Sequence, residues 1–275
     1  MDFKKNKDFF VGIDSDGTVY DSMRIKHTLS FIPAAIEVFG IEEYREEFTR
    51  IEEKVNLYSM TRGINRFPGL LMSFEKLAEE TGFSVGNTEE FSAFIESGFP
   101  FSNKGLQEYL HKNPSEFCEK VLSWSILSDQ YFDKGCEGIA PFAPVEEALI
   151  KMYESADIMV VSAASQKGLE RDWGESGIAK YTSFIAGQEI GKKKDQLLFA
   201  KKAGYAAEKM LMLGDAPGDF EAAELAGTLF YPIIPGQEEK CWEELRDKYF
   251  DIFINGEYTE KIQNELYSKF TQTLN

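Results

Sequence analysis

The stretch Phe9–Thr18 constrains the fold of this chain more than any other. It reads Phe-Phe-Val-Gly-Ile-Asp-Ser-Asp-Gly-Thr, an apolar run that ends in two carboxylates. An apolar run without polar alternation is typical of a strand buried on both faces, and Gly17 marks a sharp turn after it. We therefore expect Asp14 and Asp16 at the carboxyl end of a buried strand. In an open parallel sheet that edge binds ligands, although Asp and Gly are also common in ordinary turns.

Two other local motifs can be excluded from the sequence. A calcium-binding EF-hand loop that began at Asp14 would need Asp or Asn, Gly and Glu where the chain has Thr18, Val19 and Ile25. The stretch Gly187–Lys193 has one residue too few between its glycines for a nucleotide-binding phosphate loop. It also lacks Ser or Thr after the lysine.

Composition limits the class of protein. The chain has 275 residues, of which 43% are hydrophobic, so it can bury one large core or two smaller ones. Its net charge of -17 argues against nucleic acid or an anionic membrane as a partner, because both bind basic surfaces. The N-terminal residues contain no long apolar segment, so we expect neither a signal peptide nor a transmembrane span.

The cysteines and histidines show no metal-binding spacing. We therefore expect neither a zinc site nor a disulfide framework, and we expect a reducing cytoplasm as the compartment. The residues concerned are Cys118, Cys136, Cys241, His27 and His111.

The hydrophobic pattern divides the chain into two domains. After Ser22 it changes from buried strand to helical period and stays helical for about a hundred residues. Tyr44, Phe48, Ile51, Val55 and Tyr58, for example, recur at steps of four and three. Such aromatic stripes usually pack in a core, and we interpret them so rather than as cofactor contacts. The pattern predicts a helical domain over 23–137 and a second domain formed by 1–22 and 138–275.

The second domain alternates strands and helices. Four further apolar strands are expected near 157–162, 183–186, 210–213 and 229–231, with helical segments between them. This alternation predicts an α/β fold with a doubly wound parallel sheet. No chemistry can be assigned to the tail from Tyr249 to the end.

Polar side chains follow the buried strands where each strand ends. They are Asp14 and Asp16, then Ser162, then Asp215 and Asp219. If these strands are neighbours, several carboxylates converge, and they could not all stay ionised without a bound cation. Ligands that are all oxygen atoms favour Mg²⁺.

The segment after the strand at 157–162 offers donors for an anion. Ser162 contributes a hydroxyl, and Ala163 and Ala164 contribute backbone N–H groups at a strand-to-helix junction. Such a junction is a suitable place for a phosphate oxygen.

This order of residues resembles the haloacid dehalogenase superfamily, which has four motifs. The first, DxDGT, matches Asp14–Thr18, and the second, a strand that ends in Ser or Thr, matches Ser162. The third is a lysine just before a helix. Lys194 matches it best and Lys193 is the alternative, since the usual Lys-Pro pair is absent. The fourth, GDxxxD, matches Gly214–Asp219.

The resemblance implies a fold and a reaction. The fold is a Rossmann-like core with a helical cap inserted between the first and second motifs, which corresponds to residues 23–137. The reaction is the Mg²⁺-dependent hydrolysis of a small phosphorylated metabolite. Asp14 would be the nucleophile that forms an aspartyl-phosphate, and Asp16 would be the general acid and base.

The resemblance also implies the roles of the remaining site residues. Asp14, the backbone carbonyl of Asp16 and Asp215 would hold Mg²⁺, and Asp219 would bind the metal through water or orient Lys194. Ser162, Ala163 and Lys194 would hold the phosphoryl group. Without Mg²⁺ and Lys194, like charge would oppose the attack of a carboxylate on a phosphate.

Three other functions stay open at this point. A phosphotransferase or phosphomutase would use the same aspartyl-phosphate and pass the phosphoryl group to a sugar. A dehalogenase fits less well, because the dehalogenases of this superfamily do not carry the acid found here at Asp16. A non-catalytic Mg²⁺-binding protein would be expected to have lost Asp14, Asp16, Lys194 or Asp215, and the chain has all four.

One segment of the helical domain is a candidate for substrate specificity. Residues 60–68 contain Arg62 and Arg66 and no acidic residue, in a chain that is otherwise strongly acidic. The planar guanidinium group suits a phosphate or a carboxylate, so this loop is a candidate for binding the leaving group. The alternative is that both arginines are solvated or pair with Glu52 and Glu53.

Overall fold

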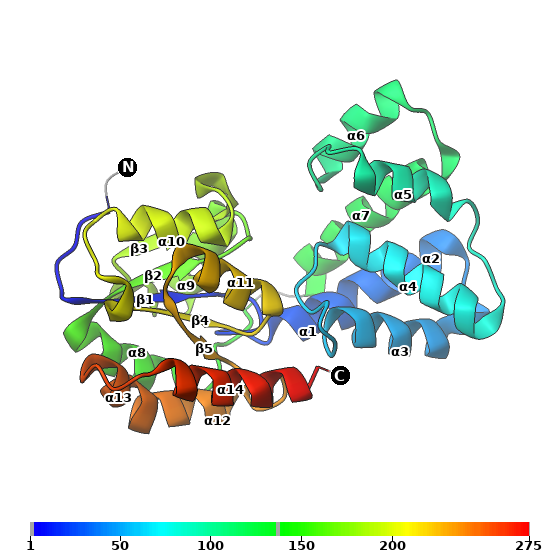
Figure 1. Ribbon diagram of the computed structural model, residues 1–275. Coiled ribbons are helices and arrows are strands. Elements are labelled where there is room, and N and C mark those ends of the chain that lie inside the picture. The colour runs from blue at the N-terminus through cyan, green and yellow to red at the C-terminus, as the bar shows by residue number, and fades with distance from the viewer. Residues whose placement is uncertain (1–2, 136–137, 275) are drawn as a thin grey trace. The chain divides into compact units, whose positions relative to one another are not determined.

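The computed structural model describes residues 3–135 and 138–274 (Figure 1). The chain divides into two compact units, which we name the core unit and the helical unit. The core unit combines the segment up to Ser22 with the segment from Gly138 onward, and the helical unit begins at Met23 and is inserted between them in the sequence.

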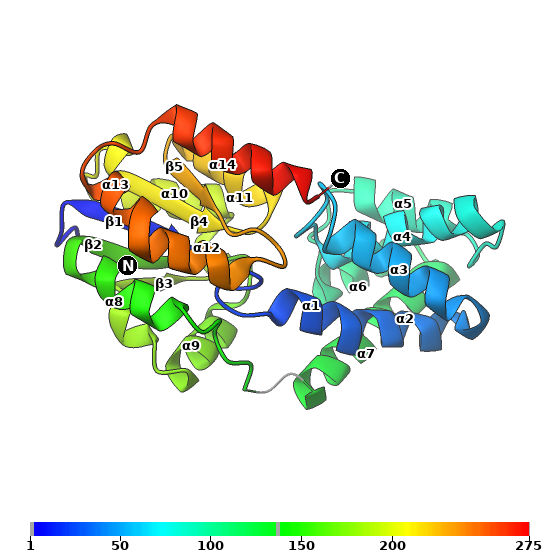
Figure 2. The same cartoon turned by 90° about the horizontal axis from the view of Figure 1, so that it is seen from below.

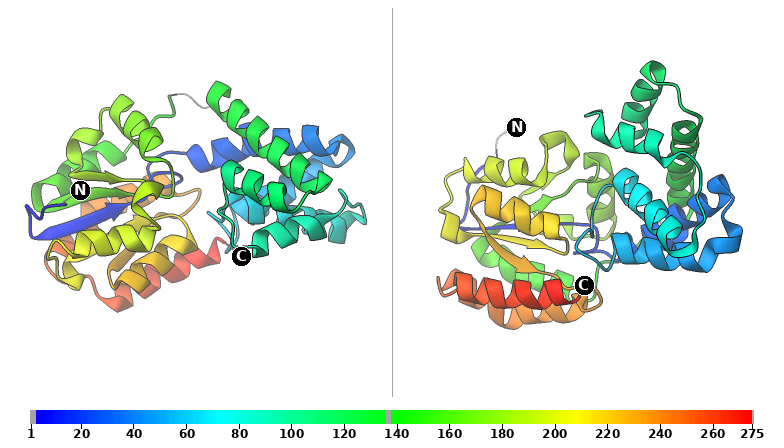
Figure 3. Two further views of the ribbon diagram at one scale, coloured as in Figure 1. Left: turned by 90° about the horizontal axis from the view of Figure 1, so that it is seen from above. Right: turned by 45° about the vertical axis from the view of Figure 1, so that its right-hand side comes forward.

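The core unit is built on a parallel sheet of five strands in the order β3-β2-β1-β4-β5. The first strand, β1, lies in the middle, where Val11 pairs with Ile158 of β2 and Leu211 of β4. The views in Figure 3 show these strands side by side. The predicted α/β fold with a doubly wound parallel sheet is confirmed. The strands are β1 (Phe9–Ile13), β2 (Ala156–Val161), β3 (Phe184–Ala186), β4 (Met210–Gly214) and β5 (Leu229–Pro232).

Helices cover both faces of the sheet, which explains the uninterrupted apolar sequence of the strands (Figure 1). Phe10 of β1 packs in the cluster beneath α10 (Lys193–Lys201) and α11 (Pro217–Ala226). The next residue, Val11, packs in the cluster on the opposite face. That cluster includes side chains of α8 (Val145–Ser155), α9 (Gln166–Glu175), α12 (Glu238–Glu244), α13 (Phe250–Ile254) and α14 (Glu260–Gln272).

The C-terminal tail, to which the sequence assigns no chemistry, closes this second face. Phe253 of α13 and Phe270 of α14 are fully buried in its apolar cluster. Figure 2 shows α12, α13 and α14 together on this side of the sheet. The core unit also has short 3-10 and π-helical turns, namely η3 (Ala179–Tyr181), η4 (Gln188–Ile190), η5 (Ala207–Lys209) and η6 (Leu245–Tyr249).

The helical unit has its own apolar core, in which Phe48, Phe74 and Trp124 are buried together. The predicted stripe is confirmed at Phe48, Ile51 and Val55, but α3 ends at Asn56, so the next expected member, Tyr58, is 40% exposed. The helices are α1 (Ser22–Lys26), η1 (His27–Phe31), α2 (Ile32–Phe39), η2 (Glu42–Tyr44), α3 (Arg45–Asn56), α4 (Arg66–Thr81), α5 (Thr88–Glu96), α6 (Asn103–Lys112) and α7 (Glu116–Gly135).

The cysteines and the helix lengths complete the description of the fold. Cys118 and Cys241 are buried free thiols, and Cys136 lies outside the described residues. Across residues 3–135 and 138–274, every helix is too short or too polar to span a lipid bilayer.

Candidate active site

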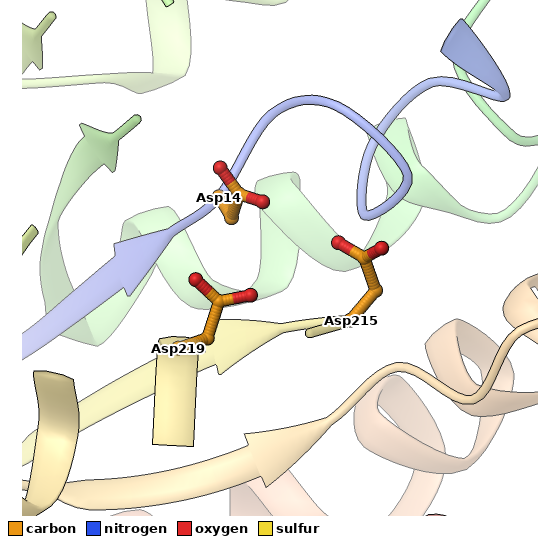
Figure 4. Close-up of side chains that lie close together, drawn as sticks. All are labelled: Asp14, Asp215 and Asp219. Atoms are coloured by element: carbon orange, nitrogen blue, oxygen red, sulfur yellow. The ribbon is translucent and has the colours of Figure 1, made fainter. Parts of the chain in front are cut away.

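Three carboxylates meet at the carboxyl edge of the sheet (Figure 4). One oxygen atom each of Asp14, Asp215 and Asp219 lies within 4.8 Å of the other two, and all three residues are buried. Asp14 follows β1 and Asp215 follows β4, and these two strands are neighbours. The Asp14 N–H donates to the carbonyl of Leu213 at 3.0 Å, so the pairing of the strands continues into the site.

Asp219 reaches the site from the first turn of α11. Its carboxylate accepts a hydrogen bond of 3.0 Å from the backbone N–H of Ala216, as an acidic residue in the first turn commonly does. Gly214 permits this close approach, because a Cβ atom there would lie 2.4 Å from the Cβ atom of Asp219. Any larger residue at 214 would push α11 away from the end of β4.

A half-buried lysine completes the cluster. The Nζ atom of Lys193 lies 3.0 Å from Oδ2 of Asp14 and 2.5 Å from Oδ1 of Asp219. Among the described residues Lys194 makes no such ion pair. Lys193 and Lys194 are adjacent on α10, so their side chains point in different directions. These contacts favour Lys193, the alternative that the sequence left open, over Lys194 as the lysine of the third motif, and the assignment stays a prediction.

Burial and charge act together on the ionisation of this cluster. Burial raises the pKa of Asp14 well above its usual range, Lys193 opposes this, and the neighbouring carboxylates add to it. Burial also raises the pKa of Asp219, and attraction to Lys193 opposes this in part. Burial lowers the pKa of Lys193, but attraction to Asp14 and Asp219 outweighs it, so the ammonium stays charged. One ammonium offsets only part of the charge of three carboxylates, and a cation would offset more.

The loop after Asp14 turns back on itself and carries Asp16. Gly17 has a φ of +80° and donates its N–H to the carbonyl of Tyr20 at 2.8 Å, a conformation that favours glycine. Asp16 is half-buried and accepts a hydrogen bond from the Ser22 hydroxyl. Its carboxylate is not one of the three that cluster in the described chain.

Ser162 lies at the same edge of the sheet, one strand away from Asp14. It follows β2, which pairs with β1, and its backbone N–H continues the ladder to the carbonyl of Ala186. Ser162 is 2% exposed, and its hydroxyl oxygen accepts the N–H of Ala164 at 3.2 Å, which leaves the hydroxyl proton available for donation. The following residue, Ala163, is exposed.

At this edge of the sheet lie two further residues to which the sequence analysis assigned no function. Thr18 donates its hydroxyl to Oδ1 of Asp215 at 2.6 Å and so orients that carboxylate. Gln196 is fully buried on α10, and its side-chain amide donates to the carbonyls of Ser162, Gly187 and Gly191. The position of Thr18 inside the DxDGT motif could have indicated it, whereas a lone Gln in an amphipathic helix gives no such signal.

The two candidate arginines belong to the helical unit. Arg62 is 6% exposed and donates to the carbonyl of Leu57 at 2.8 Å. Arg66 pairs with Asp129 at 2.6 Å, rather than with Glu52 or Glu53, and its guanidinium lies over the ring of Phe31. Both side chains are therefore held by contacts inside this unit.

Comparison with known proteins identifies a family and a fold. The sequence profile of the haloacid dehalogenase-like hydrolases matches residues 64–232, more than half of the chain. The matched segment contains Ser162, Lys193, Asp215 and Asp219, and Asp14 precedes it. No curated protein matches the sequence.

Solved structures with a similar fold share little sequence with this chain. A predicted phosphoglycolate phosphatase from Haemophilus somnus has a TM-score of 0.53 at 15% identity, covering 86% of this chain and 93% of that one. A protein from Lactobacillus delbrueckii, provisionally described as a phosphoglycolate phosphatase, has a TM-score of 0.51 at 15% identity, with coverages of 94% and 98%. A hydrolase of the same family from Deinococcus radiodurans, with bound phosphate and sodium, has a TM-score of 0.50 at 15% identity, with coverages of 84% and 83%.

Proposed function

The chain belongs to the haloacid dehalogenase-like hydrolases, and we propose that it is a Mg²⁺-dependent phosphatase that hydrolyses a small phosphorylated metabolite through an aspartyl-phosphate on Asp14. One observation carries the proposal. A buried carboxylate, Asp14, lies in contact with the ammonium of the half-buried Lys193, beside two further carboxylates. This arrangement combines a nucleophile with the positive charge that a phosphate substrate requires.

The residues present fit Mg²⁺. The three clustered ligand atoms are all carboxylate oxygens, and hard cations prefer such ligands. Asp14, Asp215 and the backbone carbonyl of Asp16 would hold the ion, while Asp219 binds through water or orients Lys193. When bound, Mg²⁺ neutralises charge on the phosphoryl group and on the carboxylates around it.

The side chains supply the chemical steps. A carboxylate oxygen of Asp14 attacks phosphorus, the bond from phosphorus to the leaving oxygen breaks, and Asp16 gives that oxygen a proton. Lys193, the Ser162 hydroxyl and the Ala163 N–H hold the phosphoryl oxygens. Asp16 then takes a proton from a water molecule that attacks the phosphorus, which releases phosphate and restores Asp14.

Asp16 separates this reaction from two of the three alternatives. A second acid is required to protonate an alkoxide leaving group, and a dehalogenase has no use for it. A phosphotransferase would share the first step and differ only in the acceptor, so water must be tested against sugar hydroxyls. A purely binding protein has no need of both Asp16 and the contact between Lys193 and Asp14.

We propose that the helical unit is the cap, spanning 23–137, and that Arg62 and Arg66 bind the part of the substrate beyond the phosphate. This role of Arg62 is supported by the burial of its side chain and by its hydrogen bond to the carbonyl of Leu57. Because these contacts already fix the side chain, it loses little conformational entropy when a substrate binds. Arg66 is held by Asp129. A cytoplasmic location and the absence of nucleic-acid and membrane partners remain predictions from the composition.

A substrate screen tests the proposed function. The purified protein is incubated with a panel of phosphorylated metabolites and with nitrophenyl phosphate, with Mg²⁺ or with a chelator, and released phosphate is measured. The panel includes phosphoglycolate, because two structural neighbours carry that description. Release that requires Mg²⁺ supports the proposal. Phosphate transfer to added sugars without release would favour the phosphotransferase.

A further inference from the structure

Two buried tryptophans of the core unit donate hydrogen bonds to the loop between Asp14 and Tyr20. The indole N–H of Trp173 lies 3.0 Å from the hydroxyl oxygen of Ser15, and that of Trp242 lies 2.8 Å from the backbone carbonyl of Thr18. Both side chains are fully buried. A buried indole N–H needs a partner, and here both partners belong to one short loop.

These hydrogen bonds connect distant parts of the chain. Trp173 lies on α9, which follows the Ser162 segment, and Trp242 lies on α12, which follows the last strand. Both rings pack in the same apolar cluster on one face of the sheet. The loop is thereby anchored from α9 and from α12, beyond its own backbone hydrogen bonds.

Each anchor acts next to a carboxylate of the site. Ser15 lies between Asp14 and Asp16 in the sequence. Thr18 accepts the Trp242 N–H at its backbone carbonyl and donates its hydroxyl to Asp215 at 2.6 Å, so one residue connects Trp242 with that acid. A shift of the loop would move the nucleophile and the metal-binding oxygens together.

We propose that Trp173 and Trp242 are positioning residues whose indole N–H groups hold this loop, and with it Asp14 and Asp215, in the geometry that binds the metal. The ring of each tryptophan fills the core, and the N–H group serves the site. The consequence for metal binding rests on the proposed function, whereas the consequence for the conformation of the loop does not.

The three tryptophans of the chain allow a matched test. Trp→Phe keeps an aromatic ring and removes the N–H group. We would make this change at Trp173, at Trp242 and at Trp124, whose N–H donates to the carbonyl of Phe31 in the helical unit at 3.0 Å. Trp124 is also buried, so Trp124→Phe is a control for the loss of a buried indole hydrogen bond.

Mg²⁺ binding is measured by calorimetry without substrate, on variants whose cooperative thermal unfolding shows that they fold. Trp173→Phe and Trp242→Phe should each weaken Mg²⁺ binding by roughly two- to tenfold, the range expected for one hydrogen bond, and Trp124→Phe should leave it unchanged. Equal affinity in all four proteins, or an equal loss in Trp124→Phe, would overturn the proposal.

A double-mutant cycle separates the hydrogen bond from packing. Ser15→Ala removes the acceptor of Trp173, so Trp173→Phe should cause little further loss of Mg²⁺ affinity when Ser15→Ala is already present. Full additivity would show that Trp173 acts through its ring and would contradict the proposal for this residue. Ser15→Ala also replaces Trp173→Phe if that variant does not fold.

Hydrogen exchange gives a readout that needs neither metal nor substrate. Amides in the peptide covering 15–20 should exchange faster in Trp173→Phe and Trp242→Phe than in Trp124→Phe. If the wild-type protein bound no Mg²⁺, the proposed function would fail and this exchange result would still decide whether the tryptophans hold the loop. Unchanged exchange in both variants would end the proposal.

Discussion

The Nζ atom of Lys193 lies 3.0 Å from Oδ2 of Asp14, and both side chains are largely buried. The same ammonium contacts Asp219 on α11. Lys193 therefore links the end of β1 to the first turn of α11, and it sits where a phosphate that approached Asp14 would need positive charge.

The lysine assignment can be tested with adjacent residues. Lys193→Met should lower kcat for nitrophenyl phosphate by roughly a hundredfold or more, because on the proposed mechanism the charge that stabilises the transition state is lost. Lys194→Met is the matched control and should keep a rate close to that of the wild type. A large loss in Lys194→Met with activity retained in Lys193→Met would reverse the assignment.

The contribution of Asp16 to the rate should increase as the leaving group becomes poorer. Asp16→Ala should lose more of kcat/KM on an alkyl phosphate than on nitrophenyl phosphate, because nitrophenolate leaves without a proton. The comparison requires steady-state kinetics of both substrates at one pH. Equal losses on the two substrates would reduce Asp16 to a structural residue of the turn.

On the proposed function, Arg62 and Arg66 of the helical unit should affect only substrates that extend beyond the phosphate. Arg62→Ala and Arg66→Ala should each raise KM for the best metabolite of the screen and leave KM for nitrophenyl phosphate unchanged. Asp129→Asn tests whether Arg66 must be held in place, and it should raise the same KM less than Arg66→Ala does. A parallel rise for both substrates would show general damage to the fold and not specificity.

Asp157 should stabilise the core unit in a pH-dependent way. It is 1% exposed and accepts the backbone N–H groups of Asn6 and Lys7 and the hydroxyl of Tyr205. Burial tends to raise the pKa of Asp157, but these hydrogen bonds outweigh it and hold the pKa below its ordinary value of 3.8. The stabilisation is therefore present above pH 3.8 and is lost as the pH falls through the lowered pKa.

Asp157→Asn should accordingly lower the free energy of unfolding by about 1–3 kcal/mol at neutral pH. The difference from the wild-type protein should narrow only below pH 3.8. Urea unfolding at several pH values measures this, and Asp8→Asn at an exposed site is the control, with an expected change within about 0.5 kcal/mol. A difference that disappears already near neutral pH would contradict the linkage.

Much of the sheet could be predicted because parallel strands covered on both faces leave a distinctive apolar pattern. β1, β2 and β4 are such strands, and each is followed directly by a polar residue of the candidate site. The sequence predicted that the acids converge only if these strands are neighbours, and the pairing of β1 with β4 brings Asp14 and Asp215 together. The apolar residues of the tail gave no comparable signal, because helices that cover a sheet have many equivalent sequences.

The sequence was less informative where the exact position of a residue on a helix determines its contacts. Lys193 and Lys194 have the same charge and neighbouring positions, and only the direction of each side chain on α10 separates them. Tyr58 continued a helical period beyond the end of α3 at Asn56. The hydrogen bonds of Trp173, Trp242 and Gln196 join residues far apart in the chain, and no local pattern predicts them.

The most direct measurement is to trap the phosphoryl group on Asp14. In Asp16→Asn the first step on nitrophenyl phosphate needs no acid, but the second lacks its base, so the aspartyl-phosphate should accumulate. After an acid quench with Mg²⁺ and substrate present, mass spectrometry should find one phosphoryl group on the peptide that contains Asp14. The double variant Asp14→Asn, Asp16→Asn should show none. An unmodified Asp14 peptide, in a variant that has released nitrophenolate in an amount equal to the enzyme, would contradict the covalent mechanism.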